Sequence, residues 1–260
     1  MRPTSITSIN KLPEQEKRET YARLIPNELL ERFYIGPDFL DKDGNDLLIL
    51  RAPAGSNTVE MSLYHKVGYR DAILYGHVVD NSNNQLHVLL YVMNDPDAAR
   101  YDVDKMPDGT WTKFGTFKRN LEAEEAAMKA GLSPGQIRKG LRAASKGQNA
   151  FELFAQSLGH AIYFVEPLYY HNAIIFESYG FSYQSGRRRM ESIQAGFQTR
   201  GELADLLDGS TYRVRAAANS IRLRSWAIHD GILGKPFTNV TMYKNIGKQA
   251  ELNTAEGTGW

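Results

Sequence analysis

The sequence predicts a mixed α/β (α+β) fold in which a largely antiparallel sheet is flanked by helices. Four stretches between residues 46 and 94 are rich in β-branched, leucine and tyrosine residues, and turn-forming residues separate them. Helical patterns that end in glycine follow, and they alternate with short apolar strands. The chain has 260 residues, of which 42% are hydrophobic, and this is enough to build a full core.

Charge and cysteine content exclude several classes of protein. The 31 Lys and Arg residues nearly balance the 30 Asp and Glu residues, so no global field favours nucleic acid or an acidic membrane surface. The absence of cysteine removes disulfides, thiolate catalysis and zinc–thiolate or iron–sulfur sites, and it fits a reducing cytoplasm. No apolar run is long enough to cross a bilayer, and residues 1–11 are too polar for a signal peptide. We therefore expect a cytoplasmic protein with a small-molecule substrate and no nucleic-acid or membrane partner, and oligomer formation stays open.

The first 45 residues are expected to form an N-terminal region of an arm and helices. Residues 1–11 have the composition of a loose arm. Residues 13–24 and 26–34 predict short surface helices, the second with Pro26 in its first turn. Residues 46–260 are then expected to form a single catalytic or binding domain with a C-terminal extension.

The strand-like part of the chain predicts an antiparallel meander of three or four strands. The expected strands cover residues 47–51, 58–66, 72–79 and 86–93. Residues 52–57 and 80–84 supply the turns, because they are rich in Pro, Gly, Ser, Asn and Asp.

An acidic stretch follows the meander. Residues 94–109 contain five aspartates, a clustering that suggests a cation site because hard cations prefer oxygen ligands. The spacing does not match a calcium-binding EF-hand loop, so we favour a solvated acidic loop. Trp111, Phe114 and Phe117 are expected to pin this loop to the core.

Helices and short strands alternate over the rest of the chain. A helix is expected at residues 121–131, and Ser133-Pro134 has the pattern of an N-cap that starts another one. Further helices are expected at residues 148–158, 172–179 and 220–231, and strands at residues 160–166, 181–184 and 240–244. The final residues are polar and predict an exposed tail.

Two segments resemble the C-terminal half of the GNAT acyltransferase superfamily. In that family a helix ending in Leu-Gly leads into a strand, an Asn follows, and a short helix ends in Tyr-Glu-x-x-Gly-Phe. Residues 157–166 have the first pattern, Asn172 follows, and Phe176-Glu177-Ser178-Tyr179-Gly180-Phe181 has the last pattern. The resemblance covers about 25 residues closely and roughly 100 more by the order of elements.

The resemblance implies an acyl-CoA thioester as cofactor and a small amine-bearing molecule as substrate. The strand at residues 86–93, through Leu90 and Val92, would hold the pantetheine arm and polarise the thioester carbonyl by a backbone N–H. Asn172 would lie beside the cofactor. The remaining cofactor-binding candidates are those that would face phosphate: Arg138, Gly140 and Arg142.

The sequence departs from the family pattern at two places. The family's phosphate loop, Gln/Arg-x-x-Gly-x-Gly/Ala, follows the fourth strand directly, whereas residues 138–143 contain one glycine and lie over forty residues after Met93. Phe176 replaces a Tyr that often protonates the departing thiolate. Another acid is therefore required, and Tyr170 and Tyr179 are nearby in sequence. A GNAT-like shell with lost or changed chemistry stays an alternative.

The densest run of chemically able side chains is residues 166–172, at the end of a predicted strand where ligand crevices of α/β sheets lie. Glu166 is the candidate general base, because burial raises the pKa of a carboxyl group. Tyr170, His171 and Tyr179 complete the candidate catalytic residues. The simpler alternative is that Glu166 binds backbone N–H groups and His171 caps the following helix.

A metal-dependent enzyme is the competing functional hypothesis. The histidines form neither His-x-His nor His-Glu-x-x-His, so no motif specifies a metal. A two-histidine, one-carboxylate site for iron, or a zinc site, would draw on His160, Glu166, His171, His229 and Asp230. A third hypothesis is a binding protein without catalysis.

Overall fold

The computed structural model describes residues 2–113, 115 and 118–260, and it confirms the predicted mixed α/β fold with a largely antiparallel sheet and flanking helices. The chain divides into two compact units. The first unit comprises Met1–Asp97, Gly140–Glu166 and Tyr243–Lys248. The second comprises Ala98–Lys139, Pro167–Met242 and Gln249–Trp260. The N-terminal 45 residues thus belong to the same unit as the meander.

The predicted antiparallel meander forms the centre of the first unit. Its strands are β1 (Leu48–Arg51), β2 (Thr58–Leu63), β3 (Leu74–Asp80) and β4 (Leu86–Met93). Each pairs antiparallel with the next. In β3 buried and half-buried residues alternate, because successive side chains point to opposite faces of the sheet.

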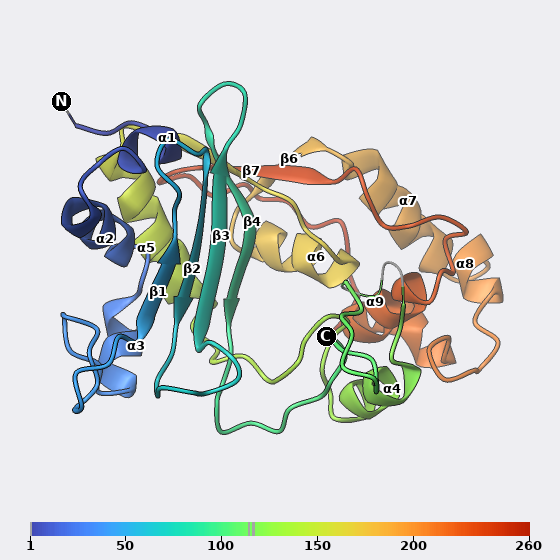
Figure 1. Ribbon diagram of the computed structural model, residues 1–260. Helices are drawn as coiled ribbons and strands as arrows, with labels where there is room; N and C mark the ends of the chain where they lie inside the picture. Colours follow the sequence, from blue (N-terminus) through green and yellow to red (C-terminus); the bar gives the residue numbers. More distant parts are fainter. Residues whose placement is uncertain (1, 114, 116–117) are drawn as a thin grey trace. The chain divides into compact units, whose positions relative to one another are not determined.

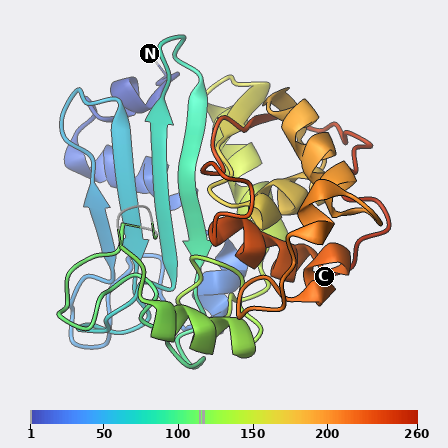
Figure 2. The ribbon, with the colours of Figure 1, turned by 90° about the vertical axis from the view of Figure 1, so that its right-hand side faces the viewer.

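Helices of the first unit cover one face of this meander, as Figures 1 and 2 show. They are α1 (Ile6–Ile9), α2 (Glu14–Ala22), α3 (Asn27–Arg32) and α5 (Ala144–Ser157). The hydroxyl group of Tyr91 on β4 donates to the carbonyl of Leu24, which follows α2. The opposite face of β2, β3 and β4 is called the helix-free face of the first unit here, since none of these four helices lies on it.

The N-terminal residues are ordered by long-range contacts, so the prediction of a loose arm is wrong. The backbone amides of Ile6 and Thr7 donate to the two carboxylate oxygens of Asp80, at 2.9 and 2.7 Å. Ile6 and Ile9 are fully buried. A polar N-terminal sequence therefore forms a helix because β3 supplies the acceptor for its first amides.

The first unit also contains β5 (Ile162–Val165) and the end of β7 (Thr241–Asn245). Strand β5 runs parallel to β4, as expected after the intervening helix α5. Strand β7 is the next neighbour of β5 in the sheet, and the amide of Ile246 donates to the carbonyl of Ala161.

The second unit is mainly helical. It contains α4 (Leu121–Lys129), α6 (Tyr170–Ser178), α7 (Arg187–Phe197), α8 (Glu202–Asp205), a 3₁₀ helix η1 (Arg215–Asn219) and α9 (Ile221–His229). Strand β6 (Ser182–Ser185) lies beside the beginning of β7. Trp226 of α9 is fully buried, and its indole N–H donates to the carbonyl of Leu132. In the part of the chain that the structure describes, no helix is both long and apolar enough to cross a membrane.

Three local predictions in the second unit are corrected. Trp111 is 64% exposed and packs against the ammonium group of Lys105 rather than the core, while Phe114 and Phe117 lie outside the described residues. Ser133-Pro134 forms a turn instead of starting a helix. The C-terminal tail is held down, because Thr254 donates its amide and hydroxyl to the buried carboxylate of Glu177.

The acidic loop is confirmed as a loop. The guanidinium group of Arg100 pairs with the carboxylates of Asp102 and Asp104. These contacts with a cationic side chain neutralise part of the acidic cluster.

Candidate functional site

Strand β5 ends at Val165, the second of its two paired positions with β4, while β4 continues to Met93. This end of β5 beside β4, called the fork, is the centre of the candidate site in the first unit. Their parallel pairing is confined to His87 with Phe164 and Val88 with Val165. Strand β4 continues to Met93, where the amide of Leu141 reaches the Met93 carbonyl. Between these points, residues 89–92 have no strand partner on the β5 side of β4 among the described residues.

A β-bulge lies at the fork. His77 of β3 pairs with Leu90, and Val78 pairs with Val88, so Leu89 is the extra residue of β4. A bulge bends its strand and changes the direction of nearby side chains. The bulge therefore lies directly after the last position of β4 that pairs with β5.

Glu166 and His87 meet at this fork. Glu166 directly follows β5 and is 52% exposed at its side chain, and its carboxylate lies 3.6 Å from Nε2 of His87. The His87 side chain is only 14% exposed. Burial lowers the pKa of His87 below its usual value, although the nearby Glu166 carboxylate opposes this shift. The imidazole is therefore neutral at physiological pH.

The two predicted strand residues, Leu90 and Val92, lie on the helix-free face with His87. Leu90 pairs with His77 and Val92 with Tyr75, and all of these side chains are half-buried. The hydroxyl group of Thr58 lies 2.9 Å from Nε2 of His77. Polar and apolar side chains thus share this face of the fork.

The candidate phosphate loop lies at the end of β4 in space, although it is distant in sequence. Gly140 forms an antiparallel bridge with Asn94, the residue after β4. A Cβ atom on Gly140 would lie 3.3 Å from the Met93 carbonyl oxygen, so glycine allows this close approach. The chain then passes through Arg142, which is exposed, into α5. The candidate phosphate loop lies over forty residues after Met93 in the sequence because residues 98–139, which belong to the second unit, come between them.

Gly147 allows the first turn of α5 to pack directly against β4. A Cβ atom there would lie 2.6 Å from the ring of Tyr91, a distance that side chains do not tolerate. The glycine therefore brings the N-terminus of α5 close to the strand. Arg138, by contrast, belongs to the second unit and donates to the carbonyl of Ala98.

The other predicted catalytic residues lie in the second unit, on or next to α6. Tyr170 is buried, and its hydroxyl oxygen accepts a hydrogen bond of 3.0 Å from Arg224. His171 is buried, with Nδ1 2.9 Å from the hydroxyl oxygen of Ser225. Burial, with His229 nearby, lowers the pKa of His171 to about 3. Tyr179 is the half-buried C-cap residue of α6.

Asn172 has a structural contact in the first turn of α6. Its side-chain oxygen accepts from the amide of Tyr169 at 3.2 Å, and its side-chain nitrogen lies 3.2 Å from Nε2 of His171. Asn172, rather than His171, therefore binds the free backbone at the start of this helix.

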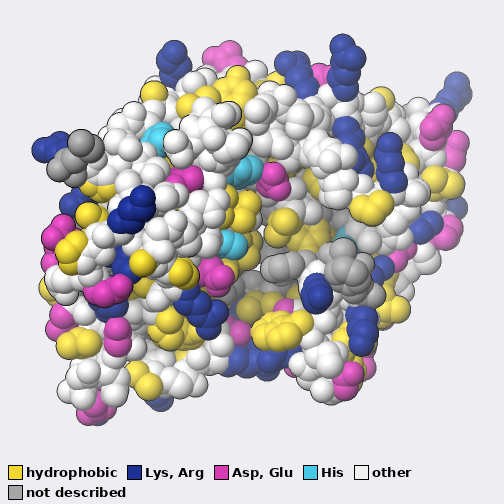
Figure 3. Space-filling view, turned by 45° about the horizontal axis from the view of Figure 1, so that its top comes forward, with side chains coloured by type: hydrophobic (Ala, Val, Ile, Leu, Met, Phe, Trp, Pro, Cys, Tyr) yellow, Lys and Arg dark blue, Asp and Glu magenta, His cyan; other side chains and the backbone are white. Residues whose placement is uncertain are grey.

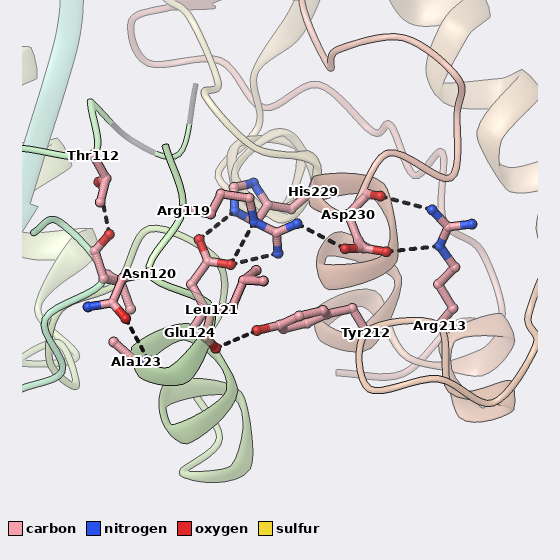
Figure 4. Close-up of polar contacts among 11 residues, drawn as sticks. Thr112, Arg119, Asn120, Leu121, Ala123, Glu124, Tyr212, Arg213, His229 and Asp230 are labelled. Carbon is pink, nitrogen blue, oxygen red and sulfur yellow. Dashed lines mark hydrogen bonds and ion pairs between the residues drawn. The ribbon is translucent and has the colours of Figure 1, made fainter. Parts of the chain in front are cut away.

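A buried charge network joins α4 and α9 in the second unit (Figure 4). Glu124 is 3% exposed at its side chain, and it accepts hydrogen bonds from Arg119 at 2.6 Å and lies 3.0 Å from His229. Asp230 accepts from Arg119 and from Arg213, each at 2.9 Å. Two carboxylates thus face two guanidinium groups. Because the network is balanced in charge, we interpret it as a structural contact.

The structure does not assemble the five residues of the metal hypothesis into one group. His160 and Glu166 belong to the first unit, and His160 bonds to the carbonyl of Thr4. His171, His229 and Asp230 belong to the second unit, where each has the partners given above. Within the described ranges, no three His, Asp or Glu residues are grouped so that they could hold a metal ion.

Charged residues of both signs are interspersed on the face shown in Figure 3, in keeping with a formal net charge of +1. A scan against protein-family models and searches of curated proteins and of solved structures found no match to this chain.

Two residues of the fork were missed in the sequence. His87 was visible only as a strand histidine, because its contact with Glu166 spans 79 residues. The sequence did contain an indication of the role of Gly147, since a glycine in the first turn of a helix is unfavourable unless a close contact requires it.

Proposed function

We propose that this chain is a GNAT-like acyltransferase that transfers an acyl group from a coenzyme A thioester to a small amine-bearing molecule. The observation that carries the proposal is the fork: β4 and β5 are parallel and pair over two residues, and β4 then continues without a strand partner on that side among the described residues. An unpaired strand edge offers backbone N–H and C=O groups to an extended ligand, as in β-strand addition. The pantetheine arm contains amide groups that suit such an edge.

The order of elements around the fork supports the same proposal. Strand β4 is the fourth strand of the chain, and residues 140–143 lead from its end into α5. Helix α5 is followed by Leu158 and Gly159 before β5, and α6 ends before Gly180 and Phe181. This is the order that the resemblance to the superfamily implies.

The residues near the start of α5 fit a phosphorylated ligand. Helix α5 has 14 residues and no side-chain cap at its N-terminus, and the positive end of its dipole favours an anion. Arg142 is exposed two residues before the first residue of this helix. The thioester would supply the activated acyl group, while Glu166 and His87 lie at the fork to handle the proton of the amine.

Isothermal titration calorimetry with acetyl-CoA tests the proposal. We expect binding with a dissociation constant below about 1 mM, a common range for enzyme substrates. The variant Arg142→Ala should bind roughly tenfold more weakly, because it loses the charge proposed to pair with phosphate. The matched control is Lys129→Ala, which removes an exposed lysine from α4. Absence of heat with the wild-type protein would contradict the proposal.

A further inference from the structure

The inference concerns the two ring nitrogens of His87, and it rests on the function proposed above. Nε2 is shielded from solvent and has no hydrogen-bond partner among the described residues. Its nearest charged neighbour is the Glu166 carboxylate, at 3.6 Å. A buried polar atom without a partner is unusual in a folded protein and requires an explanation.

We propose that His87 and Glu166 form a proton-accepting pair in which Glu166 orients the Nε2–H of His87 and Nδ1 accepts a proton from the amine substrate. A carboxylate beside one nitrogen of an imidazole selects the tautomer with its proton on that nitrogen. The other nitrogen then carries the lone pair. The distance of 3.6 Å is slightly long for a hydrogen bond, and catalytic contacts of this kind commonly tighten when substrate binds.

The position of the pair suits the reaction. His87 is in the first of the two paired positions of β4 with β5, and its side chain lies on the helix-free face with Leu90 and Val92. The directly paired residues on either side, Val79 and Phe164, are apolar. An imidazole between apolar neighbours remains neutral, so it is ready to accept a proton. Other titratable or charged groups on this face are Arg51 on β1, Glu60 on β2, and Tyr75 and His77 on β3.

The proton balance of the transfer assigns a task to each residue. The amine enters as an ammonium ion and gives one proton to Nδ1 of His87. The amide C–N bond then forms as the thioester C–S bond breaks, and the second proton of the nitrogen passes to the departing sulfur. His87 finally releases its proton to water. The Glu166 carboxylate stabilises the imidazolium form between these steps.

The first test is NMR of ¹⁵N-labelled histidine in the free protein, which needs no substrate. We expect a neutral His87 ring at pH 7 with its proton on Nε2. In Glu166→Gln, the pKa of His87 should fall further, because the opposing charge is lost. A proton on Nδ1, or a pKa of His87 that does not change in this variant, would overturn the proposal.

The second test combines calorimetry with thiol release from acetyl-CoA in the presence of a panel of primary amines. We expect His87→Gln to bind acetyl-CoA as the wild type does, but to lose at least roughly 100-fold in kcat/KM, the usual scale of general-base catalysis. Glu166→Gln should lose less and should shift the pH profile. The control His77→Gln changes a histidine of the same face that already bonds to Thr58.

The outcomes separate the two proposals. Normal transfer by His87→Gln overturns the proton-accepting pair while acyl transfer stands. If the wild-type protein neither binds acetyl-CoA nor releases thiol, the proposed function fails, and with it the role of the pair, whatever the NMR spectra show.

Discussion

The charge of the buried Glu124 carboxylate contributes to the stability of the folded state. Its carboxylate is buried and accepts hydrogen bonds from Arg119, with His229 as a second partner. We expect Glu124→Gln to lower the free energy of unfolding by about 3 kcal/mol, since removing one member of a buried charge pair leaves the others uncompensated. Urea unfolding followed by circular dichroism measures this change. Glu122→Gln, an exposed position on the same helix, is the control and should change it by less than about 0.5 kcal/mol.

The effect of Glu124 should depend on pH. Burial raises the pKa of this carboxyl group, but the hydrogen bonds from His229 and Arg119 outweigh it, and the net pKa is lowered. A lowered pKa in the folded state adds stability above the unfolded value of about 4.3, and this stability is lost as the pH falls through the folded pKa. The difference between wild type and Glu124→Gln should therefore be constant from about pH 5 to 7 and shrink below about pH 4. A difference that grows in acid would contradict this account.

At the scale of elements, α1 depends on a residue of another element. Asp80→Ala would leave the amides of Ile6 and Thr7 without their acceptor. We expect the free energy of unfolding to fall by about 2 kcal/mol, the typical cost of unsatisfied buried donors. Hydrogen exchange of residues 6–9 should accelerate at the same time. Ser82→Ala, in the exposed turn after β3, is the matched control, and equal exchange in both variants would contradict the role of Asp80.

Elements with a strong local pattern were predictable. Strands β1 to β4 begin and end within a few residues of their predicted limits, because alternating β-branched residues and polar turns specify them. Helix α7 was missed, although Met190, Ile193 and Phe197 have helical spacing and are buried. Helix α1 was not predictable, since its stabilising carboxylate is 74 residues away in sequence.

The candidate site was only partly predictable, because it also depends on contacts between residues that are distant in sequence. Glu166 was found because it ends an apolar strand before a helix. Its partner His87 and the bulge at Leu89 depend on strand register, which one sequence does not specify. Tyr170 and His171 were selected by their chemistry, and their burial follows from contacts with Arg224 and Ser225 on a distant helix.

At the scale of the whole molecule, the two units are interleaved along the chain, which passes between them at residues 97/98, 139/140, 166/167, 242/243 and 248/249. Residues 1–97 contain the meander but lack α5, whose buried Phe154 packs against Tyr21. We expect a fragment of residues 1–97 to show no cooperative urea transition, because the core would be left open.

The matched comparison is a longer fragment that joins residues 1–97 to residues 140–166 through a short Gly-Ser linker. It should gain helical signal and a steeper transition, since the Asn94–Gly140 bridge brings the two ends close together. A sigmoidal transition in the fragment of residues 1–97 alone would show that α5 is dispensable for the meander.

The bridge between Asn94 and Gly140 also bears on how such proteins are recognised. A detour that begins and ends at neighbouring positions can change length during evolution without moving the strand end or the helix start. A sequence pattern that requires a fixed spacing between the end of β4 and the start of α5 would not match a chain with an inserted segment such as residues 98–139. A pattern that lists the end of the strand and the start of the helix as two separate motifs, with any spacing between them, would still match such chains.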